Sequence, residues 1–282
     1  MSLIGVLKAD AYGHGAVSVA DAISEYVDHW YVFTPAEAVR ARLLDLTGKT
    51  TLAGMVTTET DVDMLIAHGI RPAVWTVETA RQFASTDPVL AVDTGMQRFA
   101  CPEEQLDAMF AAYAFKEAFT HASRPEMAIR FGELTAGRPN LKRHAAATAL
   151  MGDARCRFDA VRPGLALYEG AARVTARLID ARDARGPVGY TGFTTPSHRH
   201  GVIRAGYSDC LRLGPVLVNG RPQRLLEIGM QSAYVSLDAA DRIGDEVVLL
   251  GDSLTAADVG NAWGTTPQQA LQTLAGIGEK VY

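Results

Sequence analysis

Lys8 stands where a short apolar run gives way to a glycine-punctuated turn, in the sequence LIGVLKADAYGHG. Burying a lysine ammonium is costly unless its charge is paired or its proton is lost. A lysine at the carboxyl end of a buried strand is therefore a candidate for amine chemistry, in which Lys8 forms a Schiff base with a carbonyl cofactor. The structural alternative is a lysine whose apolar stem covers the strand end while its ammonium stays in water. Position alone does not favour the chemical interpretation.

The segments around Lys8 alternate between strand-like and helix-like patterns through about residue 170. Between short apolar runs, segments such as PAEAVRARLLDL carry apolar residues at helical spacing. This alternation predicts parallel strands with right-handed crossovers. Seven or eight such units favour an N-terminal (β/α)8 barrel over residues 1–170, with Lys8, Asp93 and His121 at strand ends, where the chemistry of such barrels lies. The runs are LIGVLKA, HWYVFT, TTLAGM, RPAVWT, PVLAVDT, EAFTHA and AVRPGLALY.

Residues 171–282 have a different texture, with short β-rich segments separated by glycine turns. VGYTGFT, HGVIRAGYS and GDEVVLLG are examples, and VNGRP is a hairpin signal. A short helix is expected at TPQQALQTLAG. We therefore predict a C-terminal, mostly-β domain after the barrel.

The composition excludes several classes of function. A net charge of -5 and a pI near 5.8 argue against a nucleic-acid surface. The three cysteines match neither a zinc spacing nor a disulfide framework, so we expect no metal site and a reducing compartment. No apolar run approaches the length of a secretory or membrane-spanning segment. These features predict a cytoplasmic protein that acts on a small molecule, without nucleic acid or membrane.

Several motifs occur in a fixed order: VLKADAYGHG, VDTGMQRFA, FTHA, RHAAATA, VRPGLALYEG, VGYTGF, GYSDCLRLG, GDEVVLLG and the ending GTTPQQALQTLAGIGEKVY. In this order and at these separations they resemble the alanine racemase family, nearly from end to end. The resemblance implies a barrel that holds pyridoxal 5′-phosphate (PLP) and a C-terminal β-domain. It also implies an isomerase that interconverts L- and D-alanine, working as a homodimer in which the partner completes each site.

The resemblance also assigns roles to single residues. Lys8 matches the Schiff-base lysine, which doubles as one catalytic base, and Tyr207 matches the second base, acting on the partner's cofactor. Arg162 matches the arginine that donates to the pyridine nitrogen, and His121 matches the histidine beside the ring. The remaining matches are the phosphate contacts Tyr12, Thr148, Gly164 and Leu165, and the substrate contacts Arg98 and Met230.

Racemisation requires these residue types. Removing the α-proton of an amino acid leaves a carbanion, which the conjugated cofactor delocalises. A lysine on one face of the cofactor and a tyrosine on the other, with an ordinary pKa of about 10, let the proton leave on one side and return on the other. Because an arginine does not give up its proton, Arg162 would keep the ring nitrogen unprotonated and disfavour side reactions.

Taken singly, most of these residues have plainer explanations. His121 alone is more often a strand-end histidine with satisfied hydrogen bonds, and Tyr207 alone is an ordinary strand aromatic. Asp93 fits a turn or a cap. His144 is supported only by its motif. The order of the motifs, rather than any one residue, supports the chemical interpretation.

Four sites depart from the family pattern. Ala91 stands where the family usually has a lysine, often carbamylated, that braces the substrate arginine. Ala147 and Thr148 replace an Asn-Ser pair, Gln231 replaces an acidic residue, and Gln268 replaces a tyrosine beside the phosphate. Loss of these constraints predicts a broader substrate range. It also leaves open a catalytically drifted PLP-binding relative, or a related PLP lyase or broad-specificity racemase.

The lysine strand comes very early in this sequence, whereas family members carry a further strand and helix before it. The stretch from Lys8 to Arg162 is also shorter than usual. Either segments of the molecule are missing from the sequence, or the barrel is shortened. A barrel short of strands would have unpaired edges and an open core.

Overall fold

A computed structural model describes residues 1–195 and 197–282. The chain divides into two compact units. The first contains residues 1–11 and 15–167, and the second contains residues 12–14 and 168–282. Among the described residues, no helix combines the length and the apolar character needed to cross a bilayer.

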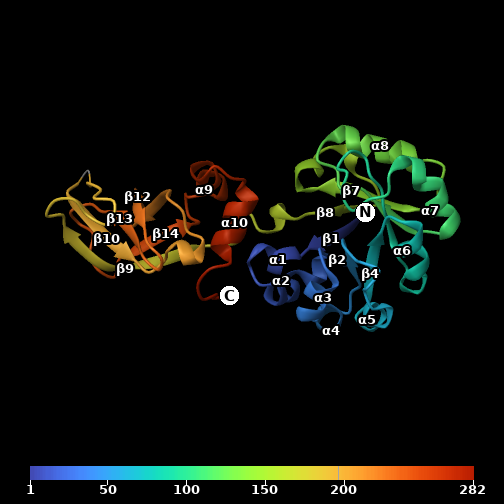
Figure 1. The fold of residues 1–282 in the computed structure, drawn as a ribbon, viewed down its shortest axis with the longest axis horizontal. Helices are drawn as coiled ribbons and strands as arrows, with labels where there is room; N and C mark the ends of the chain where they lie inside the picture. The colour runs from blue at the N-terminus through green and yellow to red at the C-terminus, as the bar shows by residue number, and fades with distance from the viewer. Residues whose placement is uncertain (196) are drawn as a thin grey trace. The chain divides into compact units, whose positions relative to one another are not determined.

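Eight parallel strands form a closed barrel in the first unit (Figure 1). β1 pairs with β2, placing Ile4 opposite His29, and with β8, placing Ser2 opposite Ala160. The strand just before Lys8 therefore closes the barrel, so the predicted (β/α)8 barrel is confirmed, and the alternative of a barrel short of strands with unpaired edges is wrong. The strands are β1 Ser2–Val6, β2 His29–Val32, β3 Thr51–Ala53, β4 Ile70–Val74, β5 Val89–Ala91, β6 Glu117–Phe119, β7 Lys142–Ala147 and β8 Ala160–Arg162.

The apolar runs of the sequence do not reveal β7 or the helix before it, α8 (Pro125–Thr135). β7 reads KRHAAA, and alanine has little preference for strands, so burial between neighbouring strands decides its conformation. α8 begins with Pro125 in its first turn and buries Phe131, whose ring packs edge-on against Phe158 at 5.5 Å. α8 is the crossover from the sixth strand to β7, which is the seventh strand of the barrel.

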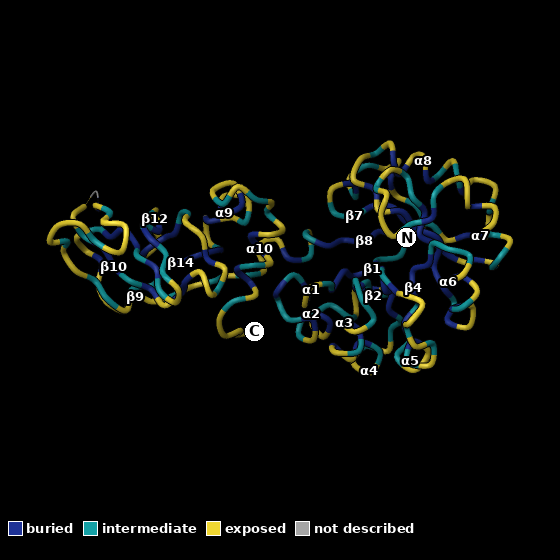
Figure 2. The backbone as a smooth tube through the Cα atoms, in the orientation of Figure 1, coloured by how far each residue is buried: buried dark blue, intermediate teal, exposed yellow. Residues whose placement is uncertain are grey.

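Helices on the outside of the barrel have buried inner faces and exposed outer faces (Figure 2). α3 begins with Pro35 at its first position, and the Glu37 side chain accepts from the backbone N–H of the N-cap residue Thr34 at 3.0 Å. α1 is a single turn whose residues 9–12 have φ values of 53–55°, a left-handed conformation that is costly for non-glycine residues. The helices are α1 Lys8–Tyr12, α2 Ala16–Ile23, α3 Pro35–Arg40, α4 Leu43–Thr47, α5 Val62–Ala67, α6 Val77–Gln82, α7 Leu106–Ala112 and α8.

An apolar cluster fills part of the barrel interior. Ala91, 2 % exposed, packs in one cluster with Phe119, and Tyr31 lies against them. The Tyr31 and Phe119 rings meet edge-on at 6.4 Å. The Tyr31 hydroxyl comes so close to Gly54 that a Cβ there would lie 2.0 Å from it, so only glycine fits. The other members of the cluster are Leu52, Ala73 and Val89.

The second unit contains a closed, six-stranded barrel in which every pairing is antiparallel. β11 and β12 form the hairpin predicted from VNGRP, and Asn219 and Gly220 have the positive φ values (49° and 76°) that a two-residue hairpin turn of type I′ requires. VGYTGFT, expected as a strand, forms only an isolated bridge between Val188 and Phe193. The strands are β9 Val174–Asp183, β10 Arg199–Ile203, β11 Pro215–Val218, β12 Arg221–Ile228, β13 Ala233–Ser236 and β14 Glu246–Leu250.

Two helices follow the second barrel. α10 (Pro267–Ala275) is the predicted terminal helix, and its N-cap Thr266 accepts a hydrogen bond from the backbone N–H of Gln269. α9 (Ala256–Trp263) precedes it, begins with a capping box at Thr255, and was not expected from the sequence. Both have a buried face, which includes Val259 and Leu274.

Candidate active site

Lys8 lies just beyond the carboxyl end of β1, at the mouth of the barrel. The backbone N–H of Leu7, which is buried, donates to the carbonyl of Tyr31 at 2.8 Å. Glu37 holds the turn that follows, because its Oε1 accepts from the N–H of Ala9 at 2.7 Å and its Oε2 from the N–H of Phe33 at 2.7 Å. Glu37 thus links the loops after β1 and β2. No motif in the sequence assigns a role to Glu37.

The electrostatic surroundings of Lys8 favour a neutral amine. Burial lowers its pKa below the ordinary value, the positive charges of Arg98 and Arg162 lower it further, and Glu37 opposes them. A lysine whose pKa is lowered in this way is a better base and nucleophile at neutral pH than an exposed one.

Arg162, the last residue of β8, is buried, with 4 % of its surface exposed. Its Nη2 donates to the carbonyl of Thr120 at 2.7 Å. Its Nη1 donates to the carbonyl of His144 at 3.2 Å and contacts His144 Nδ1. The guanidinium also lies 4.8 Å from the centroid of the Phe119 ring, a cation–π distance. These contacts fix a permanent hydrogen-bond donor in the barrel interior.

His121 follows β6 and opens onto the barrel mouth. Desolvation of its imidazole lowers the pKa of His121 to about 4, and the positive charges of Arg162, Lys8 and Arg98 lower the pKa as well. His121 is therefore neutral at physiological pH. The structure brings Lys8, Arg98, His121 and Arg162 into one electrostatic neighbourhood, although they come from four different segments.

Thr148 forms a small cradle with the turn after β8. Its Oγ1 accepts hydrogen bonds from the backbone N–H groups of Gly164 at 3.1 Å and Ala166 at 3.2 Å. Leu165, predicted as a backbone donor, lies between these two residues and begins the 3-10 turn Leu165–Leu167. Two N–H groups that converge with a hydroxyl form the kind of concavity that binds phosphate oxygens. Ala166 is a donor that the motifs of the sequence do not reveal.

Arg98 lies in the loop after β5, where its guanidinium is 5.6 Å from the centroid of the Phe99 ring. Phe99 packs edge-on against Phe33 at 5.7 Å and Trp75 at 5.8 Å. Asp93 holds the same loop, because its Oδ1 accepts from the N–H groups of Gly95 and Gln97. This is the turn role that the plainer explanation of Asp93 predicts.

The remaining predicted site residues belong to the second unit. Tyr12 stacks on Tyr168 with ring centroids 5.0 Å apart. Tyr207 and Met230 lie together: the Tyr207 N–H donates to the Gly229 carbonyl at 2.9 Å, and the Ser208 N–H donates to the Met230 carbonyl at 3.0 Å. Tyr207 and Met230 are 56 % and 61 % exposed. Gln231 and Gln268 are exposed as well.

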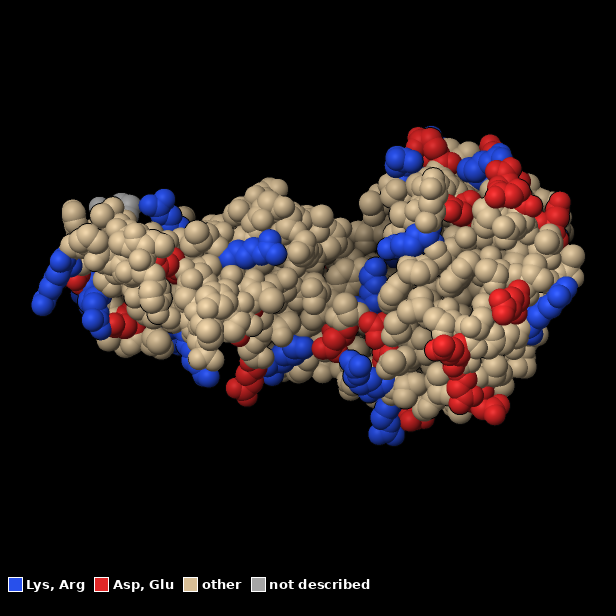
Figure 3. Space-filling view, in the orientation of Figure 1, with Lys and Arg blue, Asp and Glu red and all other residues tan. Residues whose placement is uncertain are grey.

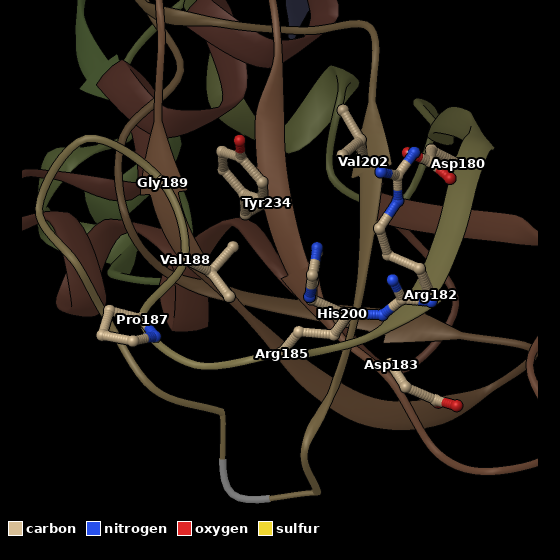
Figure 4. Close-up of a pocket in the computed structure, with 10 residues that line it drawn as sticks. All are labelled: Asp180, Arg182, Asp183, Arg185, Pro187, Val188, Gly189, His200, Val202 and Tyr234. Atoms are coloured by element: carbon tan, nitrogen blue, oxygen red, sulfur yellow. The ribbon is translucent and has the colours of Figure 1, made fainter.

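A cleft of about 730 Å³ lies in the second unit, between β9, β10 and the loop after β9 (Figure 4). Arg182 pairs with Asp180 on its rim, and His200 and Tyr234 line its inner wall. None of the predicted site residues lines it. The cleft is lined by both acidic and basic side chains. Acidic and basic side chains are likewise interspersed over the surface shown in Figure 3.

The architecture and the site define a class. A parallel barrel followed by a β-domain, with a lysine after the first strand, an arginine at the end of the eighth and a phosphate-type cradle, is the arrangement expected of barrel-type PLP enzymes. Models of the alanine racemase N-terminal and C-terminal domains match residues 1–172 and 171–282. The chain belongs to the alanine racemase family, whose members are PLP-dependent isomerases.

Individual relatives agree with this assignment. The chain is 28% identical to the alanine racemase of Pectobacterium atrosepticum, over 96% of this chain and 89% of that protein. It is 29% identical to that of Neisseria gonorrhoeae, over 95% and 89%. The structure of an alanine racemase from Bartonella henselae with covalently bound pyridoxal phosphate matches with a TM-score of 0.85 and 24% identity, covering 97% of this chain and 90% of that one. The biosynthetic alanine racemase of Pseudomonas aeruginosa matches with a TM-score of 0.83 and 23% identity, with the same coverage.

Proposed function

We propose that this protein is a PLP-dependent racemase that interconverts L- and D-alanine, with Lys8 as one catalytic base and Tyr207 as the other. The setting of Lys8 supports this most strongly: its amine lies at the barrel mouth, where burial, Arg98 and Arg162 lower its pKa. Similarity over 96% of the chain to proteins named alanine racemase supports alanine as the substrate.

The residues at the mouth of the first barrel fit PLP. The Thr148 hydroxyl accepts from the Gly164 and Ala166 N–H groups and keeps its own proton to donate to the phosphate. Arg162 offers a donor for the ring nitrogen, and Lys8 offers an amine for the aldehyde. When bound, PLP supplies an electron sink that stabilises the negative charge left at the α-carbon when its proton departs.

The protein's own residues bind the substrate and move the proton. Arg98 binds the substrate carboxylate, and the Phe99 ring orients its guanidinium. Lys8 Nζ accepts or returns the α-proton on one face, because its lowered pKa increases the fraction of neutral amine. His121, whose pKa is lowered to about 4, adds no positive charge beside Lys8 and the substrate at neutral pH.

Tyr207 is proposed to act on the cofactor of a partner subunit, so that the working form is a homodimer with shared sites. The exposure of Tyr207, which is 56 % accessible beside the exposed Met230, supports this, because its ring is open to contact from a second subunit. We expect an obligate interface of roughly 2,000 Å² or more. The free thiols of Cys101, Cys156 and Cys210 support a cytoplasmic location.

Two variants and two measurements test the role of Lys8. The visible absorption of the PLP-loaded protein and the conversion of L- to D-alanine are measured for the wild type, Lys8→Ala and Lys142→Ala. Lys142 is an exposed lysine at the opposite end of the barrel, where β7 begins. Lys8→Ala should lose both the lysine-dependent absorption and turnover, whereas Lys142→Ala should keep both. Unchanged absorption and turnover in Lys8→Ala would refute the assignment.

A further inference from the structure

A continuous line of polar contacts, buried at Arg162, His144 and Glu117 and half-buried beyond them, runs from Arg162 to the opposite end of the first barrel. Arg162 Nη1 contacts His144 Nδ1, and His144 Nε2 lies 2.8 Å from Glu117 Oε1. Glu117 Oε2 accepts from Arg71 Nη1 at 2.7 Å, and Arg71 also forms an ion pair with Asp87 at 3.2 Å. His144 is 1 % exposed and Glu117 is 8 % exposed, so neither exchanges partners freely with water.

The chemistry of the partners fixes which nitrogen of His144 carries the proton. A guanidinium has no acceptor, so His144 Nδ1 must present its lone pair to Arg162. The proton of the neutral ring is then on Nε2, where it is donated to the Glu117 carboxylate. Burial lowers the pKa of His144 to about 4, with Arg162 acting in the same direction, and this keeps the ring neutral. The contacts of Glu117 with His144 and Arg71 outweigh its burial and hold its pKa far below the ordinary value.

We infer that Glu117 is a positioning residue for the ring end of the cofactor: it holds His144 in the Nε2–H tautomer, and this tautomer in turn anchors the Arg162 guanidinium. The inference rests on the proposed function for its consequence in catalysis, but the tautomer itself is a property of the protein alone. A carboxylate suits this role because it only accepts, so it can take N–H groups from His144 and Arg71 together. No motif in the sequence assigns a role to Glu117 or Arg71.

The substitution Glu117→Gln tests this because an amide cannot satisfy both neighbours. Its oxygen accepts from either Arg71 or His144, and its NH₂ group then faces the other as a second donor. The charged Arg71 should take the oxygen, since hydrogen bonds to ionised groups are the stronger ones. The NH₂ group then faces His144 Nε2, which must become an acceptor. The ring proton of His144 then moves to Nδ1, where it points at the N–H of Arg162, and two donors cannot form a hydrogen bond with each other.

The direct measurement is the ¹⁵N spectrum of the histidine side chains in the cofactor-free protein, with His144 assigned from the spectrum of His144→Asn. Protonated and unprotonated ring nitrogens have well-separated shifts. The wild type should show Nε2 protonated and Nδ1 unprotonated, and Glu117→Gln should show the reverse. In the double variant Arg71→Met/Glu117→Gln the amide can turn its oxygen to His144, so the wild-type tautomer should return. Protonated Nδ1 in the wild type, or no change in Glu117→Gln, would overturn the inference.

Activity supplies the second measurement. Glu117→Gln should lower kcat by roughly tenfold or more, the scale of losing a hydrogen bond to a charged group, with KM for alanine changed less than threefold. The double variant should recover most of kcat. A purely structural role of Glu117 predicts instead that the double variant has a lower kcat than Glu117→Gln alone. Thermal unfolding of each variant establishes that it is folded. If the wild type neither binds PLP nor racemises alanine, the proposed function fails, while the tautomer result stands or falls separately.

Discussion

Replacing Thr148 by valine should weaken cofactor binding through the phosphate while leaving the chemistry of the loaded enzyme intact. Valine has nearly the shape of threonine but no hydroxyl, so the N–H groups of Gly164 and Ala166 lose the oxygen that both now contact. In the cofactor-free protein this should cost about 1 kcal/mol, chiefly at the buried Gly164, because water can reach the exposed Ala166.

The cost in binding PLP should be larger. A hydrogen bond from the Thr148 hydroxyl to a charged phosphate is worth about 1.5–3 kcal/mol, which corresponds to a rise of roughly tenfold to a hundredfold in the dissociation constant. The constant is measured by titrating cofactor-free protein with PLP and following absorption. The same titration with pyridoxal, which lacks the phosphate, should show less than a twofold difference between wild type and Thr148→Val.

Thr148→Ser is the matched control, since it keeps the hydroxyl and should bind PLP within about threefold of the wild type. At saturating PLP, kcat of Thr148→Val should stay within about twofold. Equal weakening of PLP and pyridoxal binding would mean that Thr148 acts through the general shape of the site. Unchanged PLP binding would mean that the cradle does not hold the phosphate. Either result would refute the reasoning.

Four further outcomes are expected. Mixing inactive Lys8→Ala and Tyr207→Ala subunits should restore activity in hybrid dimers to about half that of a wild-type dimer, measured after subunit exchange is confirmed by mass; no recovery would place both bases in one chain. Serine and larger amino acids should racemise at rates comparable to alanine, and a preference for alanine of several hundredfold in kcat/KM would contradict the predicted broad range. Phe99→Ala should raise KM for alanine severalfold with little change in kcat, since it removes only the ring that orients Arg98, whereas an unchanged KM would exclude that role. The pKa of His144 is lowered to about 4 in the folded protein, so as the pH falls the unfolded state binds a proton at this residue before the folded state does. The free energy of unfolding should therefore decrease below about pH 6.5, by up to about 1.4 kcal/mol per pH unit. Denaturant unfolding at pH 7, 6 and 5 measures this, and a free energy that does not change with pH would contradict it.

The barrel was predictable because its pattern repeats. Each strand from β1 to β5 is a short apolar run followed by a helical segment, and the alternation itself specifies parallel pairing. β7 breaks the pattern, since its run of three alanines carries almost no strand signal and only tertiary burial decides its conformation. The hairpin at Asn219 was predictable for a local reason, because the residues that tolerate positive φ are few.

The candidate site was predictable only in part. Motif spacing singles out Lys8 and Arg162, but it is silent on the side chains that hold them. Glu37 looks like an ordinary helix-capping residue, and only the fold shows that its carboxylate also receives the N–H of Ala9. Glu117 opens a strand and looks like a solvent-facing charge until the closed barrel places His144 and Arg71 beside it. Such contacts depend on the register between distant strands, which no local pattern encodes.

The alanine at position 91 can be understood from the space around it. A lysine there would place a charged amine among Leu52, Ala73 and Phe119, where it would need an ionised partner to offset its desolvation. In this chain Tyr31 packs against the same cluster, so the position is occupied by apolar surface and needs no charge. The support of Arg98 then comes from the ring of Phe99, itself held by two further aromatic rings. An aromatic face attracts a guanidinium without fixing its hydrogen-bonding direction as a carbamate oxygen would. This difference is a physical reason to expect Arg98 to accept carboxylates in a wider range of positions, and so to expect the broad substrate range that the altered pocket residues predict.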